Sequence, residues 1–347
     1  MVAKNPWTNF WLTFEAFLLF LGGAPALADN AKPAPKPALA PSEIVAAAPK
    51  GDWVAIAASD LLVMDLASGK RVVIQLMPPP FSQRWVGNIR KLAAAHWWDG
   101  TSINRVQDNY VVQWGDANAE DKVKAKAVLA DVVAKVKEPF QTGVNLDELI
   151  RIMNKVTQRA GGAALRIPEW RKIYPDYDYF GSPDAYARMT SFIQGWPIAT
   201  NVRQSIWPVH CYGMVGVGRD MPPDAGTGAE LYTVIGHAPR HLDRNIALVG
   251  RVIAGIEHLS SLPRGTGPLG FYEKPEERTG ITSIRIGSEV AGLPRFEYLS
   301  TESASFAAYA DARANRRDPF FIQPAGGADI CNIPVPVRVV PSEPTRK

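Results

Sequence analysis

The stretch Asp99-Gly-Thr-Ser-Ile-Asn-Arg-Val-Gln-Asp-Asn-Tyr-Val-Val-Gln-Trp-Gly-Asp116 decides the fold. A β-rich run ends at Val106, polar residues 107–109 follow, and a second run begins at Tyr110, a pattern that predicts an antiparallel hairpin. One cation, Arg105, lies among the apolar residues of this hairpin. A buried unpaired charge is costly. Arg105 therefore lies on an exposed face, pairs with an acid such as Asp108, or has a functional task.

The composition is that of a globular protein with many turns. The 347 residues are 46% hydrophobic and 21% charged, which suits one large or two small domains. The 28 glycines and 29 prolines predict a loop-rich chain. The net charge of +4 is small for this length, and no basic cluster is interleaved with aromatic residues. Nucleic acid is therefore not an expected partner.

The N-terminal residues 1–28 resemble an export signal. Lys4 precedes a mostly apolar run over 10–21, and Ala26-Leu27-Ala28 has the small-x-small pattern of a cleavage site. The run is shorter than the roughly 20 residues of a spanning helix, and Glu15 interrupts it. We expect a cleaved signal and a periplasmic protein without stable membrane insertion. The alternatives are a retained N-terminal anchor and a misplaced start codon.

Two cysteines, Cys211 and Cys331, bear on the same question. In an exported protein two cysteines can pair as a disulfide. Cys211 also lies in an apolar run, where a buried free thiol is equally consistent with the sequence. Both interpretations stay open at this point.

The chain after residue 28 begins with a linker and continues with a hairpin and a helix. Residues 29–50 are rich in Pro and Ala and predict an extended linker, with a helical turn or two over 42–48 that Ser42 caps. Two β runs over 60–66 and 70–76 predict a hairpin. The helix is indicated by apolar residues at helical spacing. These are Phe81, Trp85, Ile89 and Leu92.

An inserted helical hairpin is predicted after the Asp99 stretch. Its two apolar stripes are Leu129, Val132, Val133 and Val136, then Leu146, Leu149, Ile150 and Met153. Glu120 and Asp121 suit the start of the first helix because they complement its dipole. Residues 168–208 are rich in aromatics and Pro without a clear period, which we interpret as a long structured loop.

Short β runs dominate the remainder of the chain. They cover 212–217, 230–235, 246–252 and 281–286, separated by Gly, Pro and Asp. An amphipathic helix is predicted within 300–317, and 329–340 is at most an edge strand. Many short strands with few helices indicate a mainly β antiparallel barrel or sandwich.

Familiar cofactor and nucleophile motifs are missing from the sequence. There is no Walker sequence and no Gly-x-Ser-x-Gly elbow. His237 and His241 are four residues apart, but Pro239 between them argues against a helical metal site. We therefore expect no metal and no cofactor. Any catalysis must work through positioning and electrostatics.

Four pieces of the sequence, taken in order, resemble cyclophilin-type peptidyl-prolyl cis-trans isomerases. Asn88-Ile-Arg-Lys-Leu92 is similar to the family's Asn-Phe-x-x-Leu. Residues 98–116 are similar to its Tyr-x-Gly-x-x-Phe-His-Arg and Phe-x-x-Gln-Gly-Gly-Asp. Gly228-Ala-Glu-Leu-Tyr232 stands where the family has Gly-Ser-Gln-Phe-Phe. Residues 242–252 are similar to its Leu-Asp-x-x-x-x-x-Phe-Gly-x-Val.

The resemblance implies an eight-stranded antiparallel barrel capped by helices, with a substrate groove on its outer surface. It predicts an isomerase domain over 51–290, with an insertion at about 117–200 and a C-terminal extension over 291–347. Arg105 matches the catalytic arginine, and Gln113 the substrate-binding glutamine. The other matched positions are Tyr110, Val111, Leu231 and Tyr232 for the proline pocket, Val217-Gly218-Arg219 for the substrate backbone, and His241 and Ile246 at its rim.

Several positions depart from the family pattern. Glu230 replaces Gln, adds a negative charge near the site and is expected to pair with Arg105. Trp114 replaces Gly and is expected to crowd the strand after Gln113. Side-chain alternation along a strand requires Val111 and Gln113 to share one face.

The predicted function is acceleration of X-Pro rotation during the folding of exported proteins, with proline-containing polypeptides as clients. The barrier arises from the partial double-bond character of the C–N bond. A guanidinium donor lowers it by favouring the twisted state, in which nitrogen regains its lone pair. The alternative is a catalytically weak binding or scaffold module of the cell envelope.

Overall fold

The computed structural model describes residues 37–132, 140–143, 184–201 and 205–340. The chain divides into two units, Met1–Pro37 and Ala38–Lys347, and almost all described residues belong to the second. The predicted signal over 1–28 lies outside the described residues, as do residues 29–36 of the predicted linker. No helix in the described ranges has the length and apolar character needed to cross a membrane.

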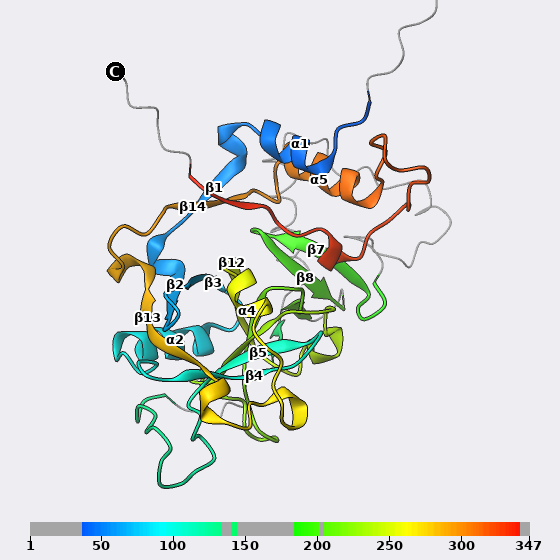
Figure 1. The fold of residues 1–347 in the computed structure, drawn as a ribbon. Coiled ribbons are helices and arrows are strands. Elements are labelled where there is room, and N and C mark those ends of the chain that lie inside the picture. The colour runs from blue at the N-terminus through cyan, green and yellow to red at the C-terminus, as the bar shows by residue number, and fades with distance from the viewer. Residues whose placement is uncertain (1–36, 133–139, 144–183, 202–204, 341–347) are drawn as a thin grey trace, which may run out of the picture. The chain divides into compact units, whose positions relative to one another are not determined.

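The centre of the second unit is a closed barrel of eight antiparallel strands (Figure 1). In barrel order these are β10 (Met214–Val217), β11 (Leu231–Val234), β5 (Val111–Gly115), β4 (Ser102–Val106), β13 (Thr279–Ile286), β2 (Leu61–Leu66), β3 (Arg71–Leu76) and β12 (Leu248–Ala254). The predicted barrel is confirmed, including the hairpin of the Asp99 stretch, which is the β4–β5 pair.

The barrel interior is filled by side chains that alternate along each strand. Met64, Ile74 and Val112 are almost completely buried there. Trp114 is also fully buried in this core. The expectation that Trp114 crowds the groove strand is therefore wrong, because alternation sends its indole to the face opposite Gln113.

Helix α2 (Gln83–Ala94) packs against β12 and β13 and closes part of the barrel. Its buried residues include Trp85, Ile89 and Leu92, as the predicted stripe requires. The indole N–H of Trp85 donates to the carbonyls of Ala225 and Gly226 at 3.0 and 3.1 Å, so the helix also fixes the loop that leads into β11.

A second sheet lies outside the barrel, in the order β6-β9-β8-β7. Its strands are β6 (Thr142–Gly143), β7 (Met189–Ile193), β8 (Trp196–Thr200) and β9 (Ser205–Pro208). The prediction of a long loop over 168–208 is wrong for these residues. The β7–β8 hairpin turns at Gln194 and Gly195, both with positive φ, and Pro197 lies within β8 opposite Phe192.

The predicted start of the inserted helical hairpin is also wrong. Residues 116–132 form turns and irregular backbone, with no helix at Glu120 or Leu129. Asp116 and Asp121 accept several backbone N–H groups here, which stabilises turns in place of a helix. The second predicted stripe, over 146–153, lies outside the described residues.

A third sheet, β1-β14-β15, joins the start of the described chain to its end. It contains β1 (Trp53–Ile56), β14 (Phe296–Leu299) and β15 (Val337–Val339), the last at the sheet edge as predicted. Helix α1 (Pro41–Ala47) packs on α5 (Ala304–Ala314) beside it. The cap of α1 is Ala40, so Ser42 is a helical residue and not the predicted cap.

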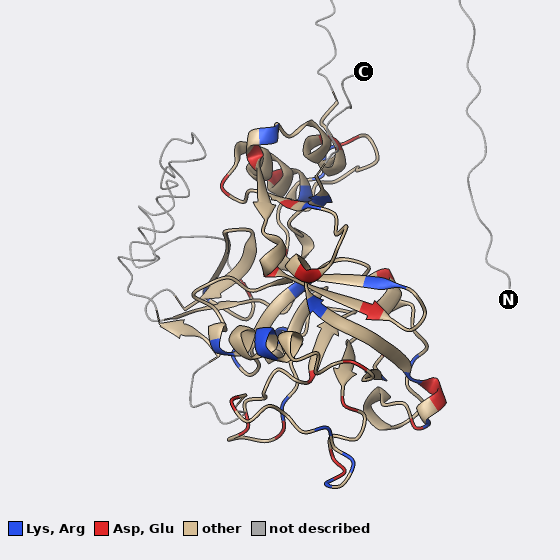
Figure 2. Ribbon diagram, turned by 90° about the vertical axis from the view of Figure 1, so that its left-hand side faces the viewer, with Lys and Arg blue, Asp and Glu red and all other residues tan. Residues whose placement is uncertain are grey.

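The remaining helical elements are short. They are α4 (Glu257–Ser260) and the 3-10 turns Lys50–Asp52, Ala58–Asp60, Arg240–Leu242, Pro268–Gly270, Pro275–Glu277, Gly287–Glu289 and Ile330–Asn332. Acidic and basic positions are interspersed over the barrel and its loops (Figure 2). This distribution fits the small net charge of +4.

Candidate active site

A β-bulge in the first strand of the hairpin brings two predicted site residues together. Ile103 pairs with Trp114, but the next pair is Arg105 with Gln113, so Asn104 is an extra residue. Its amide donates to the carbonyl of Gly115 at 3.2 Å and is buried. Because a bulge shifts the alternation by one residue, Ile103 faces the core and Arg105 faces outward beside Gln113.

The guanidinium of Arg105 is held by three acceptors. Nε donates to the carbonyl of Leu269 at 2.7 Å, Nη1 donates to Oε1 of Gln113 at 3.2 Å, and Nη2 donates to Oε1 of Gln107. The rings of Phe271 and Tyr110 lie 5.3 and 5.7 Å from its central carbon. Burial lowers the pKa of Arg105, while Tyr110 and Glu230 act in the opposite direction.

Glu230 is bonded to Gln113 and not to Arg105. Its Oε2 accepts from Nε2 of Gln113 at 2.9 Å. The expected Arg105–Glu230 ion pair is not formed among the described residues, because Gln113 lies between the two groups and bonds to both. Burial raises the pKa of the Glu230 carboxyl, and the charges of Glu120 and Asp116 add to that rise.

The bonded side chains of Gln107, Arg105, Gln113 and Glu230 form a polar row. An apolar pocket lies beside this polar row. Val111, Tyr232 and Val234 are buried together, and Tyr110, Leu242 and Ile246 pack against them. The exposed ring of His241 stacks on Tyr110 with 6.3 Å between ring centres, so His241 borders the pocket from outside.

Leu231 does not belong to the pocket, which corrects the role implied for it by the resemblance. Its side chain is buried in the barrel core and pairs across the sheet with Trp114. Leu231 and Tyr232 are neighbours on β11 and point to opposite faces. Only Tyr232 can therefore reach the groove.

The polar row and the apolar pocket share one groove of about 740 Å³. Of the twelve residues predicted from the sequence, nine line it. These are Arg105, Tyr110, Val111, Gln113, Gly218, Arg219, Glu230, Tyr232 and Ile246. The N–H of Gly218 donates to the carbonyl of Glu230 at 2.9 Å, which fixes the far wall of the groove.

Sequence reasoning missed two walls of the groove. Leu269 and Phe271 form one wall from a loop more than 160 residues after Arg105 in the chain. The turns after β5 form the other, with Asp116, Glu120 and Lys126. The positive φ of Leu269 aims its carbonyl at Arg105, and no motif in the sequence signals such a contact.

This arrangement can bind an apolar ring and act on a neighbouring amide. Tyr110, Val111, Tyr232 and Ile246 supply an apolar cavity, and the Arg105 guanidinium provides a fixed cationic donor beside it. Among the described residues no cluster of three or more His, Cys, Asp and Glu side chains could hold a metal ion. Cys211 and Cys331, outside the groove, are joined by a disulfide.

Comparisons with known proteins bear on the family and the fold. The family model described as cyclophilin type peptidyl-prolyl cis-trans isomerase/CLD matches residues 63–286. None of the curated proteins matches the chain.

Among solved structures, the chain is similar to the crystal structure of cyclophilin AquaCyp293 from Hirschia baltica. The TM-score is 0.56, with 20% identity over 84% of this chain and 95% of that chain. It also matches a Cryptosporidium parvum cyclophilin type peptidyl-prolyl cis-trans isomerase crystallised in the presence of the dipeptide Ala-Pro, with a TM-score of 0.36. That match has 11% identity and covers 65% of this chain and 98% of that chain.

The family match extends over nearly the whole barrel, and the first structure supports the same fold. The chain belongs to the cyclophilin-type peptidyl-prolyl cis-trans isomerase family.

Proposed function

We propose that this protein accelerates rotation about X-Pro bonds in polypeptides, with the proline ring in the Tyr110–Val111–Tyr232–Ile246 pocket. The observation that carries the proposal is the outward-facing pair of Arg105 and Gln113 beside this apolar pocket in one groove. A ring held in the pocket places its amide within the reach of the guanidinium.

The chemistry requires only positioning and charge. The rotation barrier of about 20 kcal/mol arises because the amide nitrogen shares its lone pair with the carbonyl. In the twisted state the nitrogen regains this lone pair and becomes a better acceptor. A donor fixed in advance stabilises that state more than either planar isomer, and only such differential binding increases the rate. No bond is made or broken, so no nucleophile is required.

The clients that we propose are exported proteins. Two observations support this: the signal-like segment over 1–28 and the Cys211–Cys331 disulfide, a bond that persists in oxidising compartments. The proposed location is the periplasm, where proline rotation limits the folding of newly exported chains. A signal-cleavage site mapped by N-terminal sequencing of the exported protein tests this part, and recovery of the intact N-terminus in the cytoplasm would contradict it.

The test of the activity compares wild type, Arg105→Ala and Arg71→Ala in a proline-isomerisation assay. Removing a preorganised donor lowers rates by about 100-fold or more in other enzymes, so we expect a loss of that order for Arg105→Ala. Arg71 is an exposed barrel arginine paired with Asp65, and its variant is expected to retain the wild-type rate. Equal accelerated rates for wild type and Arg105→Ala would refute the catalytic assignment of Arg105, and a wild type that binds peptide without accelerating rotation would favour the scaffold alternative.

A further inference from the structure

The hydroxyl of Tyr232 is anchored behind the apolar pocket. Tyr232 is 5% exposed, and its ring packs with Val111 in the pocket. Its hydroxyl lies 2.9 Å from Nε2 of His210, and the two rings are stacked 6.4 Å apart with an interplanar angle of 11°. The family resemblance places Phe at this position, so both the hydroxyl and its anchor are features of this chain.

His210 is itself fixed by a carboxylate. Nδ1 of His210 and its backbone N–H both lie within 3.0 Å of Oδ1 of Asp243. Since an ionised carboxylate only accepts hydrogen bonds, Nδ1 carries the proton and Nε2 is left to accept from Tyr232. Burial lowers the pKa of His210, which favours this neutral form. For Asp243, burial raises the pKa, but the bonds from His210 and Arg240 outweigh burial and the net shift is downward.

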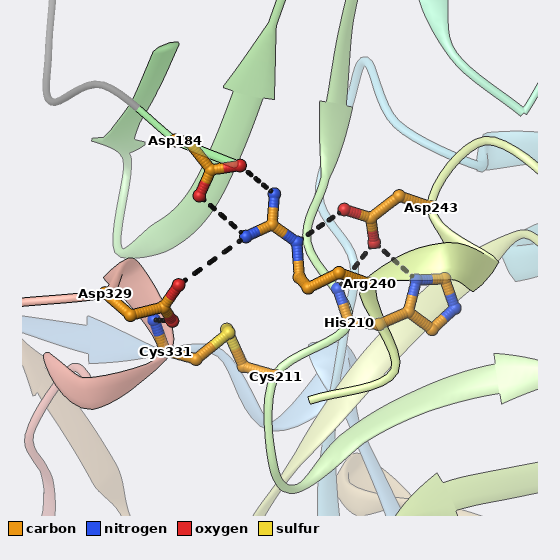
Figure 3. The surroundings of a disulfide bond; sticks show 7 residues. All are labelled: Asp184, His210, Cys211, Arg240, Asp243, Asp329 and Cys331. Atoms are coloured by element: carbon orange, nitrogen blue, oxygen red, sulfur yellow. Dashed lines mark hydrogen bonds and ion pairs between the residues drawn. A yellow bond between two sulfur atoms is a disulfide. The ribbon is translucent and has the colours of Figure 1, made fainter. Parts of the chain in front are cut away.

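The carboxylate is held in turn by Arg240 (Figure 3). Nε of Arg240 donates to Oδ2 of Asp243 at 2.7 Å, and its two terminal nitrogens each lie 2.8 Å from a carboxylate oxygen of Asp184. The side chains of Arg240, Asp243 and Asp184 are each less than 5% exposed. A buried pair with this bidentate geometry is rigid because each guanidinium nitrogen donates to a fixed carboxylate oxygen.

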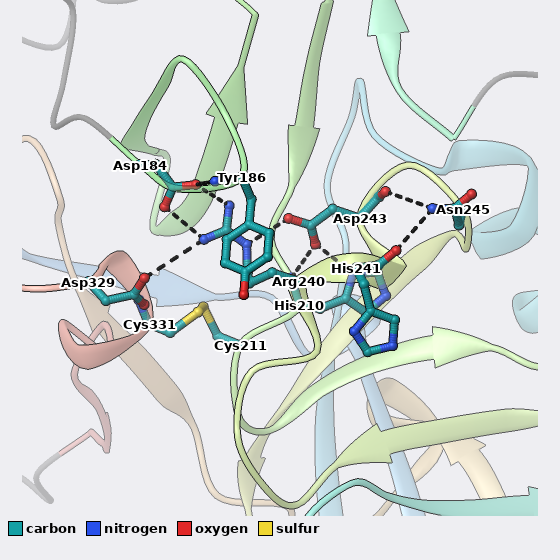
Figure 4. Close-up of polar contacts among 10 residues, drawn as sticks. All are labelled: Asp184, Tyr186, His210, Cys211, Arg240, His241, Asp243, Asn245, Asp329 and Cys331. Carbon is teal, nitrogen blue, oxygen red and sulfur yellow. Dashed lines mark hydrogen bonds and ion pairs between the residues drawn. A yellow bond between two sulfur atoms is a disulfide. The ribbon is translucent and has the colours of Figure 1, made fainter.

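The other partners of Arg240 come from the segments that lie outside the family pattern. Asp184 lies at the end of the insertion, and Tyr186 after it covers the guanidinium at 5.0 Å (Figure 4). Asp329, in the C-terminal extension, lies 3.9 Å from Arg240. Cys331 follows Asp329 and is bonded to Cys211, the residue after His210.

We propose that His210 is a positioning residue for the proline pocket: with Asp243, Arg240 and Asp184 behind it, it holds the ring of Tyr232 at the pocket floor. The proposal rests on the proposed function, since it concerns the same pocket. A Tyr hydroxyl without an acceptor in an apolar cavity carries a desolvation cost. Loss of His210 would therefore turn the hydroxyl toward water in the groove and displace the ring from the pocket floor.

A double-mutant cycle on the full chain tests this role. Affinity for an Ala-Pro-containing peptide is measured by titration, and kcat and KM by the isomerisation assay, for wild type, His210→Phe, Tyr232→Phe and the double variant. We expect His210→Phe to weaken affinity and raise KM by about tenfold when Tyr232 is present, because it leaves the hydroxyl unsatisfied. In the Tyr232→Phe background the same substitution is expected to change both by less than twofold, with kcat changing less than KM throughout.

Equal losses in the two backgrounds would overturn the proposal, since they would show a general structural role without coupling to Tyr232. His210→Gln keeps an acceptor for the hydroxyl and a donor for Asp243, and it is expected to recover most of the lost affinity. If His210→Phe does not fold, the cycle is repeated with Asp184→Asn, whose side chain has nearly the same shape. We expect this variant to lose about threefold in peptide affinity when Tyr232 is present and to lose no affinity in the Tyr232→Phe background. An inactive wild type would refute the proposed function, while the peptide titrations would still decide this proposal.

Discussion

Glu230→Gln is the perturbation that most directly tests how the groove works. Gln113 donates to the Glu230 carboxylate at 2.9 Å and accepts from Arg105 at 3.2 Å. Both ends of the Gln113 amide are thus engaged by the protein. If substrate binding, which the family resemblance implies for Gln113, turns its amide or uses the N–H that Glu230 accepts, the bond to Glu230 must first break. The substitution keeps an acceptor for Gln113 but removes the charge.

The magnitude follows from the difference between two hydrogen bonds. A bond to a charged group contributes about 1.5–3 kcal/mol and one between neutral groups about 0.5–1.5 kcal/mol, so the substitution lowers the cost of releasing Gln113 by about 1 kcal/mol. Since about 1.36 kcal/mol corresponds to a factor of ten, we expect kcat/KM to rise about fivefold above the titration range of Glu230.

The assay is kcat/KM for a neutral X-Pro peptide from pH 4 to pH 8. Burial raises the pKa of Glu230 above its ordinary value, so the carboxyl is protonated at the acid end and the wild type then approaches the variant. The stability of the fold is also expected to depend on the ionisation of Glu230. A raised pKa in the folded state makes ionisation of Glu230 a cost that appears as pH rises through that pKa, so Glu230→Gln is expected to unfold at a higher temperature at pH 8 and at the wild-type temperature at pH 4.

Glu120→Gln is the matched control. Glu120 lines the same groove and raises the pKa of Glu230 through its charge, but it is not bonded to Gln113 in the described structure. Glu120→Gln is expected to shift the pH dependence of kcat/KM slightly toward acid and to leave the value of kcat/KM at pH 8 unchanged. A Glu230→Gln enzyme whose kcat/KM equals or falls below wild type over the whole pH range would refute the idea that Glu230 restrains Gln113.

Three further outcomes are expected. Reduction of the Cys211–Cys331 disulfide, which spans 120 residues, should cost on the order of 5 kcal/mol of unfolding free energy in urea titrations with and without reductant. Gly216→Ala should reduce peptide affinity while the far-UV circular dichroism is unchanged, because the new Cβ would lie 2.3 Å from atoms of Tyr232. Trp114→Gly should destabilise the fold by about 3–5 kcal/mol in the same urea titrations, since it empties a fully buried site.

The sequence was sufficient for the barrel because its strands are local signals. The runs at 60–66, 70–76 and 110–116 alternate or are continuously apolar between turn residues, and each forms a strand. The run over 189–208 was missed because Pro197 and Pro208 break the usual pattern. Pro197 is the second residue of β8 and Pro208 the last residue of β9, so both lie near strand ends, where a missing N–H interrupts the ladder least.

The site was predicted to the extent that it depends on the hairpin. Arg105 and Gln113 are eight residues apart and meet through the pairing of β4 with β5. Leu231 was placed wrongly because a motif match does not show which face of a strand a side chain occupies. Leu269 was not found because its contact is made by a backbone carbonyl, which carries no residue signature.

The contacts of Arg105 indicate where the control of the rate lies. A guanidinium has five N–H groups, and Leu269, Gln113 and Gln107 accept from three of them. One N–H on each terminal nitrogen is left, so Arg105 can donate to a substrate without breaking a protein contact. A donor fixed in this way undergoes no reorganisation during the reaction. Gln113 keeps one N–H and one carbonyl lone pair, but its bonds to Arg105 and Glu230 fix the orientation of its amide, so turning that amide toward a substrate breaks one of them. We therefore expect differences in rate between this enzyme and its Glu230 variants to arise mainly from the orientation of Gln113, while the three protein contacts of Arg105 are kept.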